Sequence, residues 1–386
     1  MRKKITILGS TGSVGLNALQ VIREHASEFE VIGLAASSKS EILKEQIEAF
    51  SPKSVYLKDT VLASELSKQY GKRVRVFSDA EGLREFSASL ESDILVAATS
   101  GTSALLSVLD ALEKHKRVAL ANKEILVMAG ALVMKKLKEN PGASLIPVDS
   151  EHNAIFQCLE GNPREGIEKI ILTGSGGPLR EISEVDFVNL TKEVVVNHPK
   201  WKMGKKISVD SATLMNKGLE IIEAAWLFDM PIDKIQVLIH PEAVIHSMVE
   251  FKDGAVLAQL GVTDMKLPIQ HALSFPKRLA SDRSMRLDFS KISNLTFSLP
   301  NRQKFPCLDI AYQAALRAGS APCVLSAADE VAVGAYLEDR IEFKDIPNVI
   351  EKVLSHHCHV ADPDLSQIQS IHCWAIEETK KLCQAR

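Results

Sequence analysis

The sequence predicts an α/β protein in which a doubly wound parallel sheet is followed by a second α/β domain and a C-terminal helical bundle. Short β-branched runs alternate with helical periodicity over the first 149 residues, a rhythm typical of parallel sheets with right-handed crossovers. A glycine-rich string follows the first run, and several helical patterns follow one another after residue 305. These observations set the order of the three parts.

Seven apolar runs are the candidate strands of the first domain, residues 1–149. In chain order they are Ile5–Leu8, Val31–Ala36, Ser54–Leu57, Val74–Phe77, Ile94–Ala98, Val118–Leu120 and Leu145–Val148. The helical patterns between them begin near Val14, Ser40, Val61, Asp79, Ser103 and Lys123. This alternation predicts parallel pairing within one sheet.

The pattern changes in residues 150–281, which we assign to the second domain. Its elements after a first helix are a strand at Lys169–Thr173, a glycine-rich stretch at Gly174–Pro178, a polar loop at 197–206, a helix at Ala212–Phe228 and strands at Ile235–Ile239 and Val256–Leu260. Asp210 or Ser211 is expected to cap the long helix. Residues 282–305 are expected to form a linker. Residues 306–386 form the helical domain, with helices at Leu308–Ala318, Ser326–Glu338, Ile346–Leu354 and Ile368–Leu382.

Composition excludes several classes of protein. The 386 residues carry a net charge of −3, so no global cationic field is available to hold nucleic acid. The longest nearly apolar run, Ile125–Met134, covers about half a membrane span, so no transmembrane helix is expected. Six cysteines without paired short spacing, and a basic start that glycines soon interrupt, predict a cytoplasmic protein.

A nucleotide site is predicted where the first strand ends. The strand is followed by Gly9-Ser10-Thr11-Gly12-Ser13-Val14-Gly15, which opens a helix, as in Rossmann-like domains whose backbone N–H groups receive a pyrophosphate. A structural tight turn is the alternative. The second strand ends in Ala36-Ser37-Ser38-Lys39, where an NAD-binding protein places a carboxylate. Hydroxyls and a cation there favour NADP, and a plain polar loop is the alternative.

Carboxylates at two places suit a divalent cation. The first domain ends in Asp149-Ser150-Glu151, whose two carboxylates point the same way in an extended segment, although helix capping is the alternative. In the long helix Asn216, Lys217 and Glu220 share a face that suits an anionic, metal-bound ligand or, alternatively, a solvated ion pair. Oxygen donors, with no His/Cys set at zinc spacing, favour Mg²⁺ or Mn²⁺.

Two further stretches are candidates for binding a substrate. The stretch Gly174–Gly177 resembles an anion-binding nest to which Ser175 adds a hydroxyl, although a connecting turn fits the same spacing. The loop 197–206 carries Trp201 and Met203 in polar surroundings. It suits a lid that closes over a ligand, and a tryptophan that anchors an ordinary loop is the alternative.

Six strings in this order closely resemble the 1-deoxy-D-xylulose 5-phosphate reductoisomerase family, from residue 5 to beyond residue 340. They are Ile7–Gly15, Ala121–Glu124, Pro147–Ala154, Leu172–Pro178, His198–Gly204 and Ser208–Glu220. The resemblance implies a homodimeric, NADPH- and divalent-metal-dependent oxidoreductase of the non-mevalonate isoprenoid pathway, which converts 1-deoxy-D-xylulose 5-phosphate to 2-C-methyl-D-erythritol 4-phosphate. It also implies that the C3–C4 bond breaks, that the fragments rejoin as a branched aldehyde, and that NADPH reduces this aldehyde.

The resemblance further implies roles for individual residues of the catalytic domain and the nucleotide domain. The implied metal ligands are Asp149, Glu151 and Glu220, and the implied sugar contacts near the reacting carbons are Lys123 and Ser150. The phosphate end of the substrate would be held by Ser175, Ser211, Asn216 and Lys217, under a flap, residues 197–206, that includes His198, Trp201 and Met203. The implied NADPH contacts are Thr11, Gly12, Ser13, Val14, Ser37, Ser38, Lys39, Asn122, Glu124 and Gly204. His246 matches a further family histidine, or is a packed strand histidine.

Two departures from the family pattern and two rival functions stay open. The segment Ser326–Glu330 reads Ser-Ala-Ala-Asp-Glu where Asn-Ala-Ala-Asn-Glu is usual, which is expected to concern only packing in the helical domain. Ser37 replaces a common glycine and bears on contacts to the adenosine ribose.

An aldehyde or acyl-phosphate reductase would need Cys158 as its nucleophile, although the helical spacing of Cys158 indicates a core position. A non-catalytic NADPH-binding regulator would not oxidise NADPH.

Overall fold

The computed structural model describes residues 1–89, 91–99, 101–183, 187, 190–201 and 204–384. The chain divides into two compact units. The first consists of Met1–Ile125, Val133–Asn153 and Asp264–Asp282, and the second of Leu126–Leu132, Ala154–Thr263 and Arg283–Arg386. No helix in the described part of the chain is both long and apolar enough to cross a membrane.

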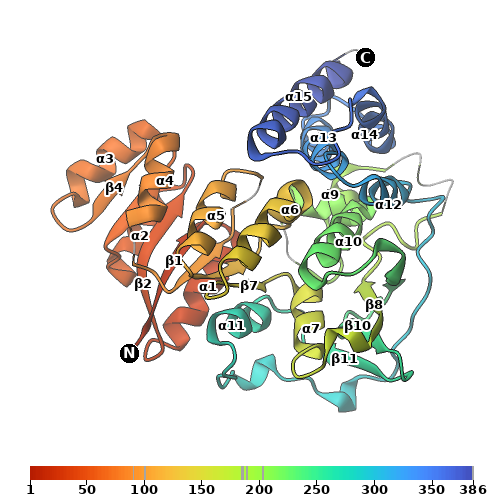
Figure 1. The fold of residues 1–386 in the computed structure, drawn as a ribbon, viewed down its shortest axis with the longest axis horizontal. Helices are drawn as coiled ribbons and strands as arrows, with labels where there is room; N and C mark the ends of the chain where they lie inside the picture. The colour runs from red at the N-terminus through yellow and green to blue at the C-terminus, as the bar shows by residue number, and fades with distance from the viewer. Residues whose placement is uncertain (90, 100, 184–186, 188–189, 202–203, 385–386) are drawn as a thin grey trace. The chain divides into compact units, whose positions relative to one another are not determined.

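A seven-stranded parallel sheet forms the centre of the first unit (Figure 1). Its strand order is β4-β3-β2-β1-β5-β6-β7. The strands are β1 (Lys3–Leu8), β2 (Phe29–Ala36), β3 (Ser54–Leu57), β4 (Arg75–Phe77), β5 (Ile94–Ala97), β6 (Arg117–Leu120) and β7 (Ser144–Pro147). All seven predicted strands are confirmed, with bounds that differ by at most two residues at either end.

The order of the strands reverses at β1, because the chain moves outward to β4 and then continues with β5 on the other side of β1. Right-handed crossovers therefore place the helices before and after the reversal on opposite faces of the sheet. These helices are α1 (Ser13–Glu24), α2 (Ser40–Phe50), α3 (Thr60–Tyr70), α4 (Asp79–Ser89), α5 (Leu105–Glu113) and α6 (Lys123–Glu139). Doubly wound sheets bind ligands at the carboxyl ends of the strands beside such a reversal. The first unit also contains α11 (Lys266–Ser274), which packs on α1.

The second unit contains a four-stranded mixed sheet with the order β11-β10-β8-β9. Its strands are β8 (Ile167–Gly174), β9 (Ile235–Ile239), β10 (Ile245–Phe251) and β11 (Val256–Leu260). β8 and β9 are parallel, whereas β10 is antiparallel to both β8 and β11. β10 is absent from the predicted strands because His246 and Ser247 interrupt its apolar run, yet the structure buries both side chains.

The predicted helix Ala212–Phe228 corresponds to α10 (Met215–Phe228), and its first two residues instead end a separate, unpredicted helix, α9 (Lys205–Thr213). Leu214 separates them, with φ +60°. This left-handed conformation costs a residue other than glycine about 1 kcal/mol or more. The predicted N-cap is therefore wrong. Asp210 and Ser211 lie in the last turns of α9, and α10 starts after Leu214, which cannot cap through its side chain.

Four helices lie in the described residues 306–384 and confirm the predicted bundle (Figure 1). They are α12 (Cys307–Arg317), α13 (Ala321–Leu337), α14 (Asp345–His356) and α15 (Leu365–Gln384). α13 contacts the other three helices, so most of its small and apolar side chains are buried on every face. It begins five residues before the predicted Ser326, because Pro322 is well suited to the first turn of a helix.

Candidate functional site

The loop after β1 packs so closely against neighbouring backbone that two of its positions need glycine. Gly9 has φ +84°, and a Cβ atom on it would lie 2.4 Å from the carbonyl oxygen of Ala98. A Cβ atom on Gly15 would lie 2.3 Å from the carbonyl oxygen of Gly9, so both positions need glycine. The N-cap of α1 is Gly12, which has no side chain with which to satisfy the first N–H groups of the helix. The amino end of α1 is therefore suited to an anion.

The other residues predicted for NADPH lie in three places. Ser37, Ser38 and Lys39 are exposed beyond β2. Asn122 is buried: its Nδ2 donates to the carbonyl oxygen of Gly101 at 2.7 Å, and its Oδ1 caps α6. Asn122 therefore fixes the loop that leads into α6. Thr11 is buried, Ser13 is exposed, Val14 and Glu124 are half-buried, and Gly204 is the exposed N-cap of α9 in the second unit.

Lys123, Asp149 and Glu151 form a polar cluster in the first unit. The Nζ of Lys123 donates to Oδ2 of Asp149 at 2.9 Å, and both side chains are largely shielded from solvent. The hydroxyl of Ser150 donates to Oε2 of Glu151 at 2.6 Å. Asp149 and Glu151 each offer a carboxylate oxygen within 4.8 Å of the other. Two carboxylate oxygens that lie this close can be drawn onto one hard cation.

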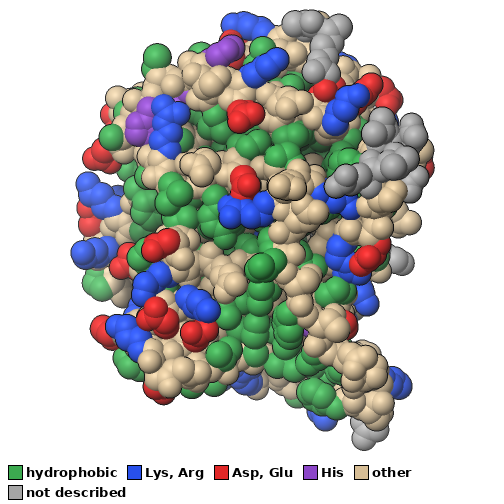
Figure 2. All heavy atoms as spheres, turned by 90° about the vertical axis from the view of Figure 1, so that its right-hand side faces the viewer, with side chains coloured by type: hydrophobic (Ala, Val, Ile, Leu, Met, Phe, Trp, Pro, Cys, Tyr) green, Lys and Arg blue, Asp and Glu red, His purple; other side chains and the backbone are tan. Residues whose placement is uncertain are grey.

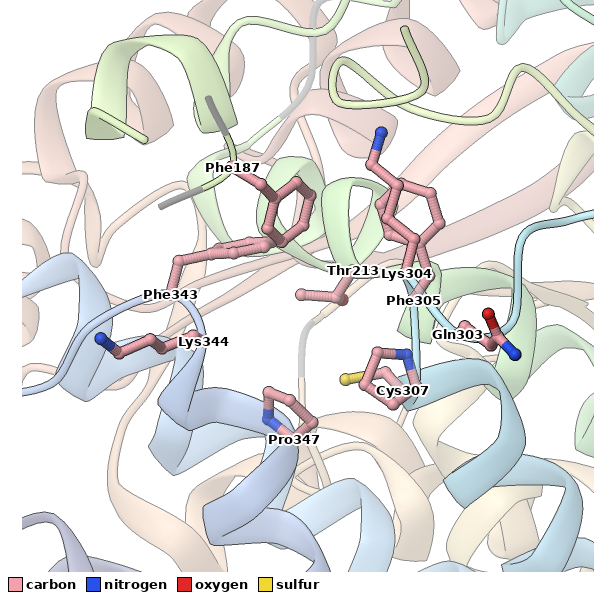
Figure 3. A pocket seen from close by; sticks show the side chains of 10 residues that line it. Phe187, Thr213, Gln303, Lys304, Phe305, Cys307, Phe343, Lys344 and Pro347 are labelled. Carbon is pink, nitrogen blue, oxygen red and sulfur yellow. The ribbon is translucent and has the colours of Figure 1, made fainter. Parts of the chain in front are cut away.

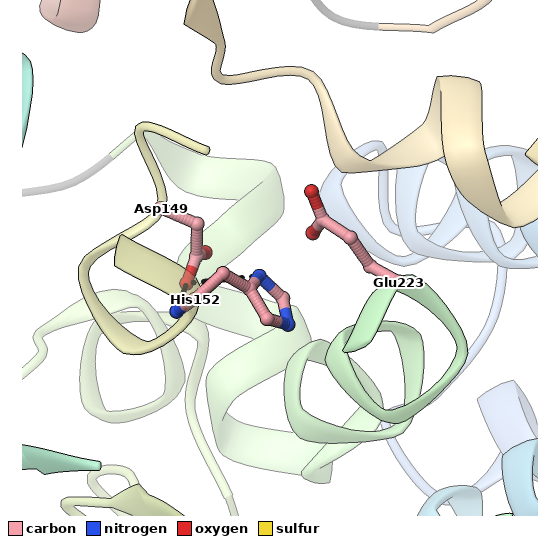
Figure 4. A group of neighbouring side chains, drawn as sticks. All are labelled: Asp149, His152 and Glu223. Atoms are coloured by element: carbon pink, nitrogen blue, oxygen red, sulfur yellow. Dashed lines mark hydrogen bonds and ion pairs between the residues drawn. The ribbon is translucent and has the colours of Figure 1, made fainter. Parts of the chain in front are cut away.

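Asp149 also caps α7 (Ser150–Cys158), as the capping alternative predicts. Its Oδ1 accepts the backbone N–H of Glu151 at 3.1 Å and lies 3.4 Å from Nδ1 of His152 (Figure 4). A carboxylate has about four lone-pair positions, so capping and metal binding are compatible. Glu223, also drawn in Figure 4, lies on α10 one turn after Glu220.

Asn216, Lys217 and Glu220 contact one another at the start of α10. The Nζ of Lys217 donates to Oε2 of Glu220 at 2.5 Å and to the carbonyl oxygen of Thr173 at 2.7 Å. The Nδ2 of Asn216 donates to Oε1 of Glu220 at 2.6 Å. Glu220 and Lys217 are buried, so the alternative of a solvated ion pair is wrong. Gly174 leaves room for the lysine, because a Cβ there would lie 2.8 Å from Lys217 Cε.

The glycine-rich stretch after β8 lies directly against α9. Gly176 and Gly177 have φ of +86° and +71°, and a Cβ on Gly177 would lie 2.5 Å from the carbonyl oxygen of Ser211. The glycine-rich stretch that carries Ser175 is therefore next to Ser211. Two of the elements predicted for the phosphate end of a ligand thus meet within the second unit.

His198 has a defined tautomer. Its Nδ1 accepts the backbone N–H groups of Lys200 at 3.1 Å and Trp201 at 2.9 Å, so the proton must be on Nε2. That N–H donates to the hydroxyl of Ser175 at 3.0 Å. Burial lowers the pKa of His198 to about 4. The imidazole is therefore neutral at pH 7 and orients the serine hydroxyl.

Trp201 of the predicted flap lies beside His246 of β10, with ring centroids 6.4 Å apart. His246 is buried, which lowers its pKa, and its Nε2 is 3.3 Å from the carbonyl oxygen of Val262. This packing fits both the lid and the anchor alternative for Trp201. Met203 lies outside the described residues.

One polar cluster escaped sequence reasoning. The Nζ of Lys206 donates to Asp210 at 2.6 Å and to Asp329 at 2.7 Å. The expectation that Asp329 concerns only packing within the helical domain is therefore wrong, because its carboxylate bonds to α9. The i,i+4 spacing of Lys206 and Asp210 could have predicted their contact. No sequence pattern indicates the contact between Lys206 and Asp329, which are far apart in the chain.

Cys158 does not have the environment of a nucleophile. Its thiol is buried, and burial raises its pKa to about 11. A reactive cysteine needs a lowered pKa and access to solvent or substrate. The geometry therefore argues against a reductase that works through a Cys158 thioester.

Comparisons with known proteins agree along the whole chain. Residues 5–130 match the family described as 1-deoxy-D-xylulose 5-phosphate reductoisomerase, and residues 145–228 and 260–378 match C-terminal domains of the same enzyme. The chain is 47% identical over 369 residues to the 1-deoxy-D-xylulose 5-phosphate reductoisomerase of Caldanaerobacter subterraneus subsp. tengcongensis, covering 96% of each chain. It is 47% identical over 379 residues to that of Thermodesulfovibrio yellowstonii, covering 98% of this chain and 99% of the relative.

Two solved structures are similar over the full length of both chains. The reductoisomerase from Zymomonas mobilis in complex with NADPH has a TM-score of 0.92 at 39% identity, with 100% of each chain covered. A DOX-P reductoisomerase in complex with NADPH, fosmidomycin and magnesium has a TM-score of 0.91 at 37% identity, again with 100% of each chain covered.

Proposed function

Because the chain belongs to the 1-deoxy-D-xylulose 5-phosphate reductoisomerase family, we propose how its own residues carry out the reaction of that family. The protein is an NADPH- and divalent-metal-dependent oxidoreductase that converts 1-deoxy-D-xylulose 5-phosphate to 2-C-methyl-D-erythritol 4-phosphate. One observation carries the residue assignment: each unit holds a cluster in which shielded carboxylates are paired with a lysine, Lys123–Asp149 in the first and Lys217–Glu220 in the second.

The metal ligands are Asp149, Glu151 and Glu220. The separation of the Asp149 and Glu151 oxygens supports this set, since both can reach one ion. The cation, when bound, supplies Lewis-acid stabilisation of the enolate-like charge that a carbon-skeleton rearrangement develops. Lys123, which Asp149 orients, and the hydroxyl of Ser150 contact the sugar beside the reacting carbons and hold it in one orientation.

The phosphate end of the substrate binds to Ser175, Ser211, Asn216 and Lys217. The close approach of Gly177 to Ser211 and the buried ammonium of Lys217 support this assignment. Binding energy gained at the phosphate orients carbons several bonds away, so it serves the chemical step as well as affinity. The flap, with His198, Trp201 and Met203, excludes water from the pocket while the C3–C4 bond breaks and the branched aldehyde forms.

The loop after β1 would hold NADPH, which supplies the hydride that reduces the aldehyde. The N–H groups at the amino end of α1 would receive its pyrophosphate, at a place where a Cβ on Gly9 or Gly15 would collide with the backbone. The exposed hydroxyls of Ser37 and Ser38, with the cation of Lys39, receive the 2′-phosphate. The remaining contacts are Thr11, Gly12, Ser13, Val14, Asn122, Glu124 and Gly204.

The assignment of the metal ligands is tested by following NADPH absorbance with substrate and either Mg²⁺ or Mn²⁺. Glu220→Gln and Asp149→Asn should each lower turnover by about 10³-fold or more, while NADPH binding, measured by fluorescence, stays within about twofold. Asp345→Asn is the matched control, because Asp345 is a buried aspartate of the C-terminal bundle whose carboxylate accepts the backbone N–H of Glu342; this variant should keep its metal dependence. Full activity in either ligand variant would contradict the metal set. No NADPH oxidation by the wild type with any divalent ion would instead favour the regulator.

The enzyme works as a homodimer in the cytoplasm. Val256 and Leu257 are exposed hydrophobic residues on β11, an edge strand, and Leu299 is exposed in the segment after residue 282. Figure 2 shows a face of the molecule on which hydrophobic side chains gather, a feature typical of interfaces. Leu257→Lys should shift the sedimentation equilibrium towards monomer, whereas Val61→Lys, at an exposed hydrophobic position on α3, should not. The six cysteines all lie in the described part of the chain and are not joined in disulfides, which fits a reducing compartment.

A further inference from the structure

A largely buried ionic cluster joins α13 of the C-terminal bundle to α9. Lys206 Nζ is 2.6 Å from Oδ2 of Asp210 and 2.7 Å from Oδ2 of Asp329. The side chains of Asp210 and Asp329 are 3% and 0% exposed, and that of Lys206 is 32% exposed. Two buried carboxylates thus share one ammonium group. Loss of Lys206 would leave two buried carboxylates without compensation, whereas loss of Asp329 would leave Lys206 paired with Asp210 and remove the bond that ties α9 to α13.

The cluster lies where apolar packing around α9 is incomplete. A pocket of about 340 Å³ is lined by Thr213 of α9, Cys307 of α12 and the rings of Phe187, Phe305 and Phe343 (Figure 3). The pKa of Cys307 is raised first by burial and then by the charges of Asp329 and Asp210, so the pocket adjoins the cluster. Because this pocket opens to solvent, fewer protein atoms pack against the end of α9 that carries Thr213. The ionic cluster therefore supplies a larger share of the restraint on α9.

The position of α9 decides where the phosphate-binding groups lie. Ser211 directly follows Asp210, and its carbonyl oxygen is in contact range of Gly177 in the nest. Beyond it, Leu214 holds a left-handed conformation, and α10 then presents Asn216 and Lys217. A shift of α9 by a few tenths of an ångström would move Ser211 relative to Ser175 and change the start of α10.

We propose that Asp329 is a positioning residue for substrate binding: through Lys206 it fixes α9, so that Ser211 and the Ser175 nest present their groups to the substrate phosphate together. The inference rests on the proposed assignment of Ser175 and Ser211 to that phosphate. Asp329 acts through Lys206 and contacts neither serine. The C-terminal bundle thereby takes part in substrate affinity in addition to supporting the fold.

The test uses the full-length enzyme with NADPH and Mg²⁺. Asp329→Ala should raise the KM for 1-deoxy-D-xylulose 5-phosphate and the inhibition constant of inorganic phosphate by about tenfold each, with a smaller change in kcat. Asp329→Asn keeps an oxygen for Lys206 and should recover part of both effects. Asp339→Ala is the matched control: it removes an ion pair to Lys192 of the same 2.6 Å length, but Asp339 is 78% exposed. Both constants should stay within about twofold in this control.

Two results would overturn the inference. The first is an Asp329→Ala enzyme that melts at a lower temperature but keeps the KM and the phosphate inhibition constant of the wild type, since the role is then structural alone. The second is additivity of Asp329→Ala and Lys206→Met, since residues that act as one unit are non-additive. If Asp329→Ala does not fold, Asp329→Asn and Lys206→Met provide the same comparison. Ser211→Ala separates the two levels: an unchanged phosphate inhibition constant in that variant refutes the phosphate assignment itself.

Discussion

The neutral state of His198 makes the stability of the protein depend on pH in a defined window. Burial lowers the pKa of His198 to about 4, against about 6.5 in an unfolded chain. At pH values between these two, the imidazole of His198 is protonated in the unfolded chain but neutral in the folded chain. The free energy of unfolding therefore falls as the pH falls. One pKa unit corresponds to about 1.4 kcal/mol, so the full window is worth about 3 kcal/mol and most of it is lost by pH 4.5.

His198→Asn should remove this dependence and leave the loop in place, because the side-chain oxygen of asparagine can accept the Lys200 and Trp201 N–H groups that Nδ1 accepts in the wild type. The assay is urea unfolding of both proteins at pH 7 and pH 4.5. The wild type should lose about 2.5 kcal/mol more than the variant. His271→Asn is the control, because burial also lowers the pKa of His271 to about 4. It should reduce the pH dependence of the free energy of unfolding by the same amount as His198→Asn. It should not change inhibition of the enzyme by inorganic phosphate.

The reasoning is refuted if His198→Asn keeps the full slope of the wild type. A midpoint near 6.5 for His198 in nitrogen-15 histidine spectra would refute it equally. A spectrum with the proton on Nδ1 would contradict the hydrogen bond from Nε2 to Ser175.

Three further predictions concern the nucleotide and the rival chemistry. Gly15→Ala should weaken NADPH binding by about tenfold or more in equilibrium fluorescence titrations, because its Cβ would lie 2.3 Å from the carbonyl oxygen of Gly9. Lys39→Ala should raise the KM for NADPH by about tenfold but leave that for NADH within about twofold, and an equal change in both would contradict the 2′-phosphate contact. Cys158→Ser should keep at least half of the wild-type kcat, whereas loss of turnover with retained folding would revive the thioester mechanism.

Local sequence was enough to predict the seven strands of the parallel sheet, since most of their residues are buried and appear as short apolar runs between helical patterns. The second unit shows where such reasoning stops. β10 reads as polar because His246 and Ser247 interrupt its apolar run, and the contacts of His246 with Trp201 and with the carbonyl oxygen of Val262 come from other parts of the chain. The break between two helices at Leu214 is not marked by a proline or glycine at that position. Both features depend on tertiary contacts that a single sequence does not display.

The candidate site follows the same division. The spacing of the glycines after the first strand was enough to predict the nucleotide loop. The structure gives the reason for two of them, because a Cβ at Gly9 or Gly15 would collide with backbone atoms. The pairing of Lys123 with Asp149 joins residues 26 positions apart, and the bond from Lys206 to Asp329 spans 123 positions. Spacing rules cover only neighbours on one helix, so these contacts needed the structure.

The charges on α10 are hard to explain by stability alone. Lys217, Glu220 and Glu223 are buried on a helix whose other buried residues are apolar or glycine. Taking a carboxylate and an ammonium group out of water costs several kcal/mol each, and a well-packed apolar pair of similar volume often does better. The hydrogen bonds from Asn216 and Lys217 to Glu220 offset this cost without removing its cause. α10 keeps this cluster next to Gly174, a glycine that leaves room for Lys217. The helix therefore presents charge at one place. Binding an anionic, metal-bound sugar phosphate is a use for which that charge is needed.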